Sequence, residues 1–408
     1  MTDPIYRYAA DLVGENLGLP LGEIDASDIP KALADKLLLA MKGSEGASSE
    51  LPSLQEEVNG FRASLLAKVL NERGHLGIKS RWPNGAGYAA CLTHDIDNIS
   101  RPVRHVFAVR NRFSPSDLAL AVLGLRSLYN NIALVAAIEN KRGVRSSFYV
   151  LTSNYNLGKI SAELTKLVAD GWEVGLHGEF GTHDSTEKME DDISRFKKAL
   201  GFNPVGVREH FLRFDFENTW RLASKAGFAY DTTVGARETL GFRIGLCTPF
   251  HPPGEDWAPM KLLELPLVLM DTTLWGYLKL GEEDGLARTR GLISLVRATG
   301  GLFTLLWHQE SLRMKGGRIY PQILDDLVAG GAWVTNANAV TSWWNSRAVP
   351  LQRREDTYLL SGGAPRGLCL EVFAREGLSP SVKGGAVERV GDRFLVRVQS
   401  GDFVMEMR

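Results

Sequence analysis

The sequence has 408 residues, of which 44% are hydrophobic and 23% are charged, a composition typical of soluble globular proteins. Its 47 basic and 48 acidic side chains leave a formal net charge of -1, which gives no indication of nucleic-acid binding. The three cysteines, Cys91, Cys247 and Cys369, are widely spaced, which argues against a disulfide framework and a thiolate zinc site. The length predicts one large domain with smaller flanking units.

The N-terminus carries early acidic residues and lacks the basic start, apolar core and cleavage site of a signal peptide. We therefore expect a cytoplasmic protein. The most apolar stretch, residues 118–128, contains Arg126 and is too short to span a bilayer. It is predicted to be a packed helix, and peripheral attachment to a membrane that carries a lipid-linked substrate is the alternative.

Residues 1–86 are predicted to form a helical N-terminal segment, with helical patterns at 30–42 and 54–74. From residue 87, short apolar runs alternate with amphipathic helices that end at glycines. The apolar runs cover residues 87–95, 144–152, 172–178, 203–211, 261–270, 301–308 and 331–336. Alternating strands and helices imply a parallel sheet, and continuous apolar runs imply strands that are buried on both faces.

Seven such units are enough to close or nearly close a barrel, so we predict an α/β protein with an irregular (β/α)-barrel over residues 87–349. An open doubly wound sheet is the alternative. Past residue 350 the pattern alternates and turns at short intervals, which is typical of strands. Residues 350–408 are therefore predicted to form a small antiparallel β module without an obvious catalytic cluster.

Most histidines fall at or just after the ends of predicted strands. Six of the eight do so: His94, His177, His183, His210, His251 and His308. In parallel βα architectures the C-terminal ends of the strands form the face on which active sites gather. Each histidine alone is better explained as a structural residue, but together they indicate a site.

The sharpest motif is THDID, residues 93–97, directly after an apolar run. Two carboxylates two residues apart on a strand point to the same side, so Asp95 and Asp97 can share a polar pocket. A metal ion would relieve their repulsion: one carboxylate ligates while the other accepts a proton from water. An Asx turn that caps the following loop is the alternative.

Three further segments supply candidate residues. The segment WEVGLHGEFGTHDS contains His177 and His183, and imidazole with carboxylate suits zinc, cobalt, nickel or manganese. The segment GVREHFLRFD contains Arg208 and His210, and LLWHQE contains His308. Arg208 can orient a carboxylate, and a buried structural salt bridge is the alternative.

These segments resemble the motifs of the polysaccharide deacetylase family, also called the NodB-homology or carbohydrate esterase family four group. THDID, LHGEFGTH, GVREHFLRFD and LLWH resemble its successive motifs, especially those of a branch that carries LTHDVD and LLWH, and the resemblance covers about two thirds of the chain. It implies an irregular (β/α)-barrel, one divalent metal, often zinc, and hydrolysis of acetamides on N-acetylated sugars. It also implies that Asp95 is the base, Asp97 a metal ligand and His308 the acid, with Arg208 steadying the base.

One departure concerns the metal ligands. The family places two histidines four residues apart, but Gly181 stands at the second position and His183 follows two residues later. We predict His183 as the third ligand after Asp97 and His177, with His210, Glu179 or water as alternatives. Asp231, in YDTT, matches a segment of the branch and is predicted to be catalytic, while Asp271 is an equally placed candidate to pair with His308.

The sequence thus predicts a metal-dependent hydrolase that removes an N-acetyl group from an amino sugar, on a nucleotide- or lipid-linked precursor. Hydrolysis of another non-peptide C–N bond and a catalytically lapsed glycan-binding or assembly module are the alternatives. The side chains expected to contact the substrate are His94, Glu179, His210, Phe211, Arg213 and Trp307. No nucleic-acid partner is expected.

Overall fold

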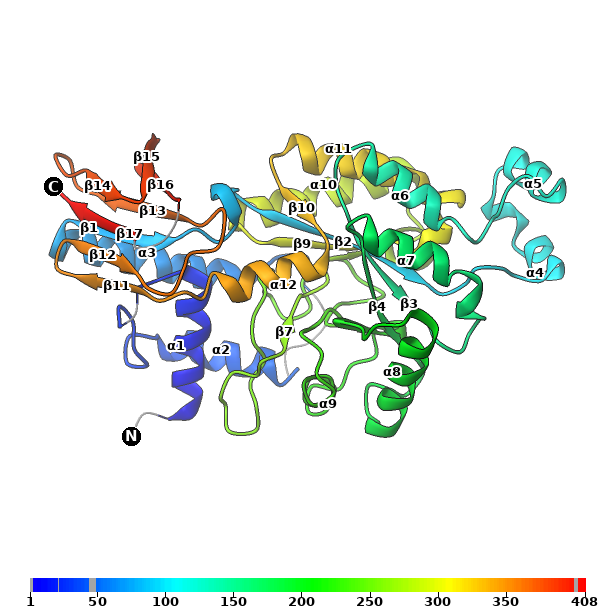
Figure 1. The fold of residues 1–408 in the computed structure, drawn as a ribbon, viewed down its shortest axis with the longest axis horizontal. Helices are drawn as coiled ribbons and strands as arrows, with labels where there is room; N and C mark the ends of the chain where they lie inside the picture. The colour runs from blue at the N-terminus through cyan, green and yellow to red at the C-terminus, as the bar shows by residue number, and fades with distance from the viewer. Residues whose placement is uncertain (1–2, 21, 44–48, 400–402) are drawn as a thin grey trace.

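The computed structural model describes residues 3–20, 22–43, 49–399 and 403–408. Its centre is a parallel sheet surrounded by helices, flanked at one end by N-terminal helices and a β module and at the other by a small projecting lobe (Figure 1). The predicted α/β class and irregular barrel, with a helical N-terminal segment and a C-terminal β module, are therefore confirmed.

The central sheet has nine strands within the described residues, in the order β7-β6-β5-β4-β3-β2-β9-β8, with β10 paired to β2. All of these pairs are parallel. The strands are β2 (Ala89–Ile96), β3 (Ser147–Val150), β4 (Glu173–Gly178), β5 (Gly206–Glu209), β6 (Tyr230–Asp231), β7 (Leu263–Glu264), β8 (Leu269–Met270), β9 (Leu302–Leu306) and β10 (Trp333–Thr335).

The two ends of this sheet come from one short stretch of chain. β7 and β8 are separated by residues 265–268 alone, so the sheet curls until its edges are joined. The joining residues bond to both sides, because the N–H of Leu265 donates to the carbonyl of Asp231 and that of Val268 to the carbonyl of Thr304. This closure makes the barrel irregular: one predicted strand, residues 261–270, becomes two short ones.

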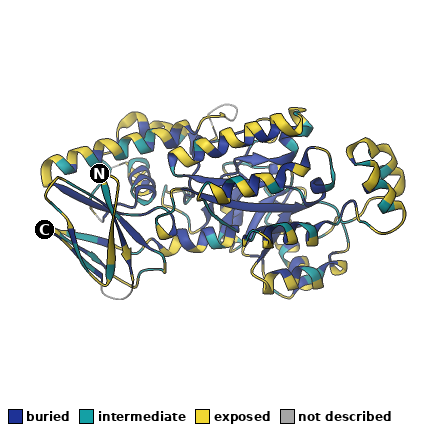
Figure 2. Ribbon diagram, turned by 90° about the horizontal axis from the view of Figure 1, so that it is seen from above, coloured by how far each residue is buried: buried dark blue, intermediate teal, exposed yellow. Residues whose placement is uncertain are grey.

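The continuous apolar runs are explained by burial on both faces. All eight residues of β2 are buried, as are all residues of β3, β4, β5 and β9 (Figure 2). Helices cover the outside of the curled sheet: α6 (Ile132–Asn140), α7 (Ser161–Ala169), α8 (Thr186–Leu200), α9 (Thr219–Lys225), α10 (Glu282–Thr299), α11 (Tyr320–Ala329) and α12 (Ala337–Ser346). Gly201 caps α8 at φ 85°, as its position in the sequence predicted.

The N-terminal segment contains α1 (Pro4–Leu17), α2 (Lys31–Met41) and α3 (Ser53–Arg73), and then a strand that the sequence analysis missed, β1 (His75–Lys79). β1 pairs antiparallel with β13 of the C-terminal module, residue 75 opposite residue 374. Because the partner lies almost 300 residues away in the chain, no local pattern marks this strand. The β module is thus built from both ends of the chain.

The C-terminal module consists of two antiparallel four-stranded sheets, β1-β13-β16-β15 and β11-β12-β17-β14. Its remaining strands are β11 (Leu351–Arg354), β12 (Thr357–Leu360), β13 (Cys369–Ala374), β14 (Pro380–Lys383), β15 (Gly385–Val390), β16 (Arg393–Val398) and β17 (Phe403–Met407). Tyr358 and Met405 are among the buried residues of its core, which is continuous with residues of the barrel such as Tyr230. The module therefore packs as an extension of the barrel.

A lobe of residues 101–126 separates β2 from α6 and projects from the body (Figures 1 and 2). It contains α4 (Val103–Ala108), η2 (Arg110–Arg112) and α5 (Pro115–Val122). The packed helix predicted over residues 118–128 is wrong, because α5 ends at Val122 and Leu123 and Leu125 are exposed. Among the described helices, none has both the length and the apolarity needed to cross a bilayer.

Candidate active site

Five polar residues from five different strand ends meet at one edge of the sheet. Asp97 directly follows β2, His210 follows β5 and Asp271 follows β8. His177 is the second-to-last residue of β4, and His308 lies two residues after β9. Because these strands are parallel, their C-terminal ends open onto the same face of the curled sheet. The structure therefore places these five residues together at this face.

Asp97, His177 and His210 form a group suited to a metal ion. One ligand atom from each lies within 4.8 Å of the others, and Asp97 Oδ1 is 3.3 Å from His177 Nε2 and 3.7 Å from His210 Nε2. His177 Nδ1 donates to the carbonyl oxygen of Arg208 at 2.8 Å, which leaves Nε2 to face Asp97. Asp97 Oδ1 is buried and accepts no hydrogen bond from the described residues. A buried carboxylate oxygen without a donor is suited to bind a cation.

The charge states of Asp97 and His210 suit a metal. Burial opposes a proton on His177, but the carboxylates of Asp95 and Asp97 outweigh it and raise the pKa of His177, so a metal ion would displace a proton from that imidazole. Burial alone would raise the pKa of Asp97, but the imidazoles of His177 and His308 lower it below its usual range. Burial and the neighbouring His177 lower the pKa of His210 to about 4. At neutral pH Asp97 is therefore ionised and His210 is neutral, with a lone pair free for a ligand bond. One carboxylate and two imidazoles are a donor set that fits zinc and similar divalent ions.

The backbone reverses sharply just after His210. Phe211 and Leu212 both have left-handed backbone angles, with φ of 61° and 50°. For residues with side chains this conformation costs roughly 1–2 kcal/mol each. Such strain is found where the surrounding structure enforces a functional arrangement, and here it borders the third residue of the metal group.

Asp95 is held beside the metal group by a fixed arginine. Asp95 Oδ1 accepts from Arg208 Nη1 at 3.3 Å, and Asp95 Oδ2 lies 3.5 Å from His177 Nε2. Arg208 is fully buried, donates to the carbonyl and hydroxyl oxygens of Thr232, both at 3.2 Å, and lies 4.9 Å from the ring of Tyr149. Its guanidinium cannot rotate away, so the carboxylate of Asp95 keeps one orientation.

His308 is oriented by Asp271. His308 Nδ1 lies 2.6 Å from Asp271 Oδ1, and the backbone N–H of His308 donates to Asp271 Oδ2 at 2.9 Å. Nε2 then points to the pocket, 3.7 Å from Asp97 Oδ2. Burial opposes the charged form of His308, but the carboxylate of Asp271 outweighs it and raises the pKa well above its usual range. Between the two partners that the sequence allowed, the structure selects Asp271.

Asp231 is placed differently from its prediction. It is fully buried, accepts from the N–H of Thr233 at 2.6 Å and from the hydroxyl of Thr233 at 3.1 Å, and interacts with Glu264. Burial raises its pKa to about 6. Its carboxylate is engaged by Thr233 and Glu264, and the partner of His308 is Asp271, so no contact with the metal group or His308 supports the catalytic role predicted for Asp231.

His183, the predicted third ligand, does not join the metal group. Its carbonyl oxygen accepts from the hydroxyl of Thr219 at 3.0 Å, and its Nε2 lies 3.7 Å from Asp184 Oδ2. Gly181 stands in the intervening loop with φ 92°, so the backbone there turns as only glycine readily does. The position taken by His183 in the prediction is filled in the structure by His210, one of the stated alternatives.

Three of the residues predicted to contact the substrate have structural partners. His94 is wholly buried, with Nδ1 donating to the carbonyl oxygen of Trp307 at 2.6 Å and Nε2 lying 2.8 Å from Glu139 Oε1. Trp307 is wholly buried as well, so neither residue can touch a substrate. Glu179 accepts from the N–H groups of Thr152 and Ser153 and fixes that loop. The predictions for His94 and Trp307 are wrong because a strand end can point into the core as well as into the pocket.

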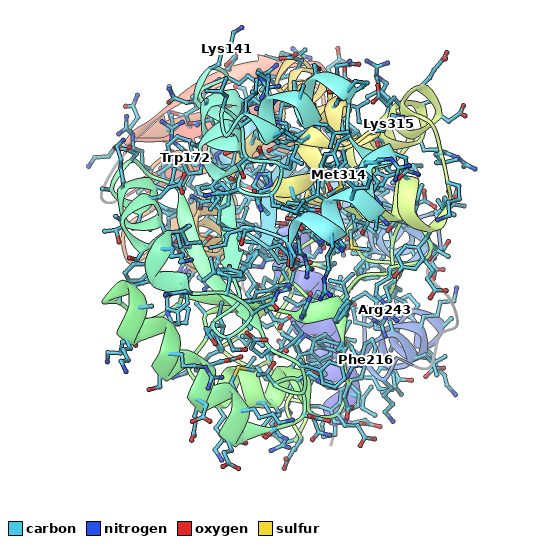
Figure 3. The ribbon with its side chains drawn as sticks, turned by 90° about the vertical axis from the view of Figure 1, so that its right-hand side faces the viewer. Lys141, Trp172, Phe216, Arg243, Met314 and Lys315 are labelled. Carbon is cyan, nitrogen blue, oxygen red and sulfur yellow. The ribbon has the colours of Figure 1, made fainter. Side chains whose placement is uncertain are left out.

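Phe211 and Arg213 remain available to a substrate. Phe211 is 51% exposed, and its ring stacks on that of His210 with centroids 4.0 Å apart. The guanidinium of Arg213 lies over the ring of Phe180 at 3.5 Å. Both line a pocket of about 620 Å³ beside the site, together with Phe216 and Arg243, which lie next to each other in Figure 3.

A second pocket opens directly onto the reacting groups. It has a volume of about 730 Å³, and both Asp97 and His308 line it. Its other walls carry Trp275, a ring that a sugar can stack on, and three basic side chains, Arg112, Lys279 and Lys315. The pocket is large enough for a sugar with a further polar group.

Glu310 lines the same pocket and was missed by the sequence analysis. Burial and the charge of Asp97 raise its pKa to about 8, so it is mostly protonated at neutral pH. It accepts from Asn98 at 3.3 Å and from Gln309 at 3.1 Å. The signal that could have found it is its position two residues after His308, in the run LLWHQE.

Comparison with known proteins adds the identity of the fold. No family model and no curated protein matches the sequence. Among solved structures, the chain is similar to a protein of Mycobacterium smegmatis described as a candidate polysaccharide deacetylase, with 19% identity over 66% of this chain and 94% of that one, at a TM-score of 0.50.

Two more of the similar structures are a candidate polysaccharide deacetylase of Pseudomonas aeruginosa PAO1 and an allantoinase. The first has 16% identity over 67% of this chain and 95% of that one, with a TM-score of 0.48. The second has 16% identity over 65% of this chain and 92% of that one, with a TM-score of 0.46. The likeness covers about the same share of the chain as the sequence motifs. The chain therefore has the fold of the polysaccharide deacetylases, the family that its motifs resemble.

Proposed function

We propose that this protein is a metal-dependent hydrolase that removes the N-acetyl group from an amino sugar. The observation that carries the proposal is the convergence of three sets of side chains at one edge of the sheet, beside the pocket that Asp97 and His308 line. A metal-type group (Asp97, His177 and His210), an arginine-held carboxylate and an aspartate-held histidine meet there. Hydrolysis of an amide is helped by a Lewis acid that polarises the carbonyl, a base that takes a proton from water and an acid that protonates the amine. These three sets can supply them.

Asp97, His177 and His210 would hold one divalent ion, with zinc preferred and cobalt, nickel or manganese as alternatives. A bound ion of this kind polarises a carbonyl and lowers the pKa of water. Asp95, fixed by Arg208 and not needed as a ligand, accepts the proton of the attacking water. Arg208 gives Asp95 a single hydrogen bond and is itself held by its bonds to Thr232.

His308 donates a proton to the departing amine. Asp271 keeps its ring protonated and turned so that Nε2 faces the pocket. An amine leaves poorly as an anion. A protonated imidazole beside the leaving nitrogen therefore lowers the energy barrier to cleavage of the C–N bond. The products are acetate and a free amino sugar.

The pocket supports a charged precursor as the substrate. Arg112, Lys279 and Lys315 line it beside Asp97 and His308, and they can balance a phosphate attached to the sugar. We therefore keep a nucleotide-linked or lipid-linked N-acetyl sugar as the proposed substrate, with peripheral membrane association in the lipid-linked case. A cytoplasmic location stays a prediction from the sequence.

The proposal is tested by measuring acetate release after removal and return of metal. Treatment with a chelator is expected to reduce release from N-acetylglucosamine oligosaccharides or a nucleotide-linked N-acetylglucosamine by about 100-fold or more, and zinc or cobalt restores it. Sugar binding without release under any ion would indicate a lapsed glycan-binding module. Cleavage of a cyclic amide in place of the acetamide would indicate the other C–N hydrolase.

Asp271→Asn tests the assignment of the acid. Asparagine keeps the shape of the side chain but removes the charge that holds His308 protonated, so we expect kcat for acetate release to fall by about 100-fold. Metal content should stay unchanged, because Asp271 is not in the metal group. Asp326→Asn, a change of the same kind at a distant ion pair with Arg290, is the control. Unchanged kcat in Asp271→Asn would remove His308 from the acid role.

A further inference from the structure

The lobe of residues 101–126 exposes an unusual amount of apolar side chain. Five large apolar residues there are between 67% and 87% exposed, more than any other large apolar residue described: Val103, Phe107, Val122, Leu123 and Leu125. They sit on a part of the chain that projects away from the barrel (Figure 2). Single exposed apolar residues are ordinary, but five in one small projecting unit mark a surface that is covered in use.

The charge of the lobe is strongly positive. It contains Arg101, Arg104, Arg110, Arg112 and Arg126, and its only acidic residue is Asp117. The carboxylate of Asp117 is already engaged, since it lies 2.5 Å from Arg126 and 3.5 Å from both Arg313 and Arg318. No acidic charge on the lobe is left to attract a basic partner, so the surface is complementary to a negative one.

The base of the lobe forms part of the active-site pocket. The carbonyl oxygen of Arg112 accepts from the N–H of Lys315 at 2.8 Å, and Phe113 forms a β-bridge with Met314. Arg112 and Lys315 line the pocket into which Asp97 and His308 open, and Figure 3 shows Met314 and Lys315 beneath the ribbon of the lobe. Whatever covers the apolar tip therefore lies next to the entrance of the site.

We propose that the lobe docks the protein on a membrane surface that carries anionic phospholipids. Exposed apolar residues enter the boundary between headgroups and acyl chains, and arginines beside them bind the negative headgroups. A second copy of the chain fits this face less well, because two lobes of the same positive charge repel each other. The inference deepens the proposed function, on which it rests for the substrate: a sugar on a membrane lipid would be presented at the pocket entrance.

The test is cosedimentation of the full chain with vesicles of phosphatidylcholine, with and without phosphatidylglycerol. We expect binding to the anionic vesicles alone, weakened by salt. The variant Val122→Ser/Leu123→Ser/Leu125→Ser and the variant Arg101→Ala/Arg104→Ala should each bind about tenfold or more weakly. Val387→Ser/Val390→Ser, which removes exposed valines from β15 at the opposite end of the molecule, is the matched control and should bind as wild type.

Two results would overturn the docking proposal. One is equal binding of the wild type and the Val122/Leu123/Leu125 variant to anionic vesicles. The other is a wild-type dimer that this variant dissociates, without vesicle binding, which would make the lobe an interface between copies. The inactive variant Asp95→Asn should bind vesicles normally, so vesicle binding without any hydrolysis would refute the proposed function and leave the docking intact. Hydrolysis of a soluble substrate should be unchanged in the lobe variant.

Discussion

Asp97→Ala and His210→Ala are expected to lower the bound divalent metal from about one ion per chain to a trace, whereas His183→Ala keeps it. The first two changes each remove one of the three side chains whose ligand atoms lie within 4.8 Å of one another. Loss of one ligand from a three-residue site leaves the metal with too few protein bonds to compete with water. His183 is outside the group, with Nε2 near Asp184.

The measurement is elemental analysis of protein prepared without an affinity tag, after dialysis against zinc at neutral pH. His183→Ala is a matched control, since it deletes the same side chain from the same face of the molecule. Metal lost in His183→Ala and kept in His210→Ala would restore the ligand that the sequence predicted. Circular dichroism of each variant separates metal loss from failure to fold.

Asp95→Asn is expected to reduce kcat for acetate release by about 10²–10⁴-fold while metal content stays near that of the wild type. The amide keeps the size of the side chain but cannot take a proton from water. Because Arg208 and His177 hold Asp95 from two sides, the substituted side chain should remain in place. The loss should therefore appear in kcat and leave the binding of the sugar largely intact.

Asp184→Asn is the control for this change, as it neutralises an exposed carboxylate near the site and should leave kcat within about twofold of the wild type. A wild-type rate in Asp95→Asn would assign the base elsewhere. If the variant lost its metal as well as its activity, Asp95 would have to be counted among the ligands, and the roles of the two aspartates of THDID would need to be exchanged.

Much of the fold was determined by local sequence. The apolar runs that became β2, β3, β4, β5 and β9 are continuous because both faces of these strands are buried, and the helices between them end at glycines in the left-handed conformation. The spacing of two residues placed Asp95 and Asp97 on one side of the chain. Parallel pairing then put Asp97, His177 and His308 at a common edge, so the position of the site followed from the order of strands and polar residues.

What the tertiary structure alone decided depends on contacts between distant residues. His210 joins the metal group in place of His183 because of the turn that the backbone makes at Phe211 and Leu212. Asp271 pairs with His308 in place of Asp231 because the curl of the sheet places β8 beside β9. β1 has no local signal because its partner β13 is at the other end of the chain. Apolar residues of the lobe were expected to be packed, because hydrophobicity predicts burial without revealing whether a neighbour exists to cover the surface.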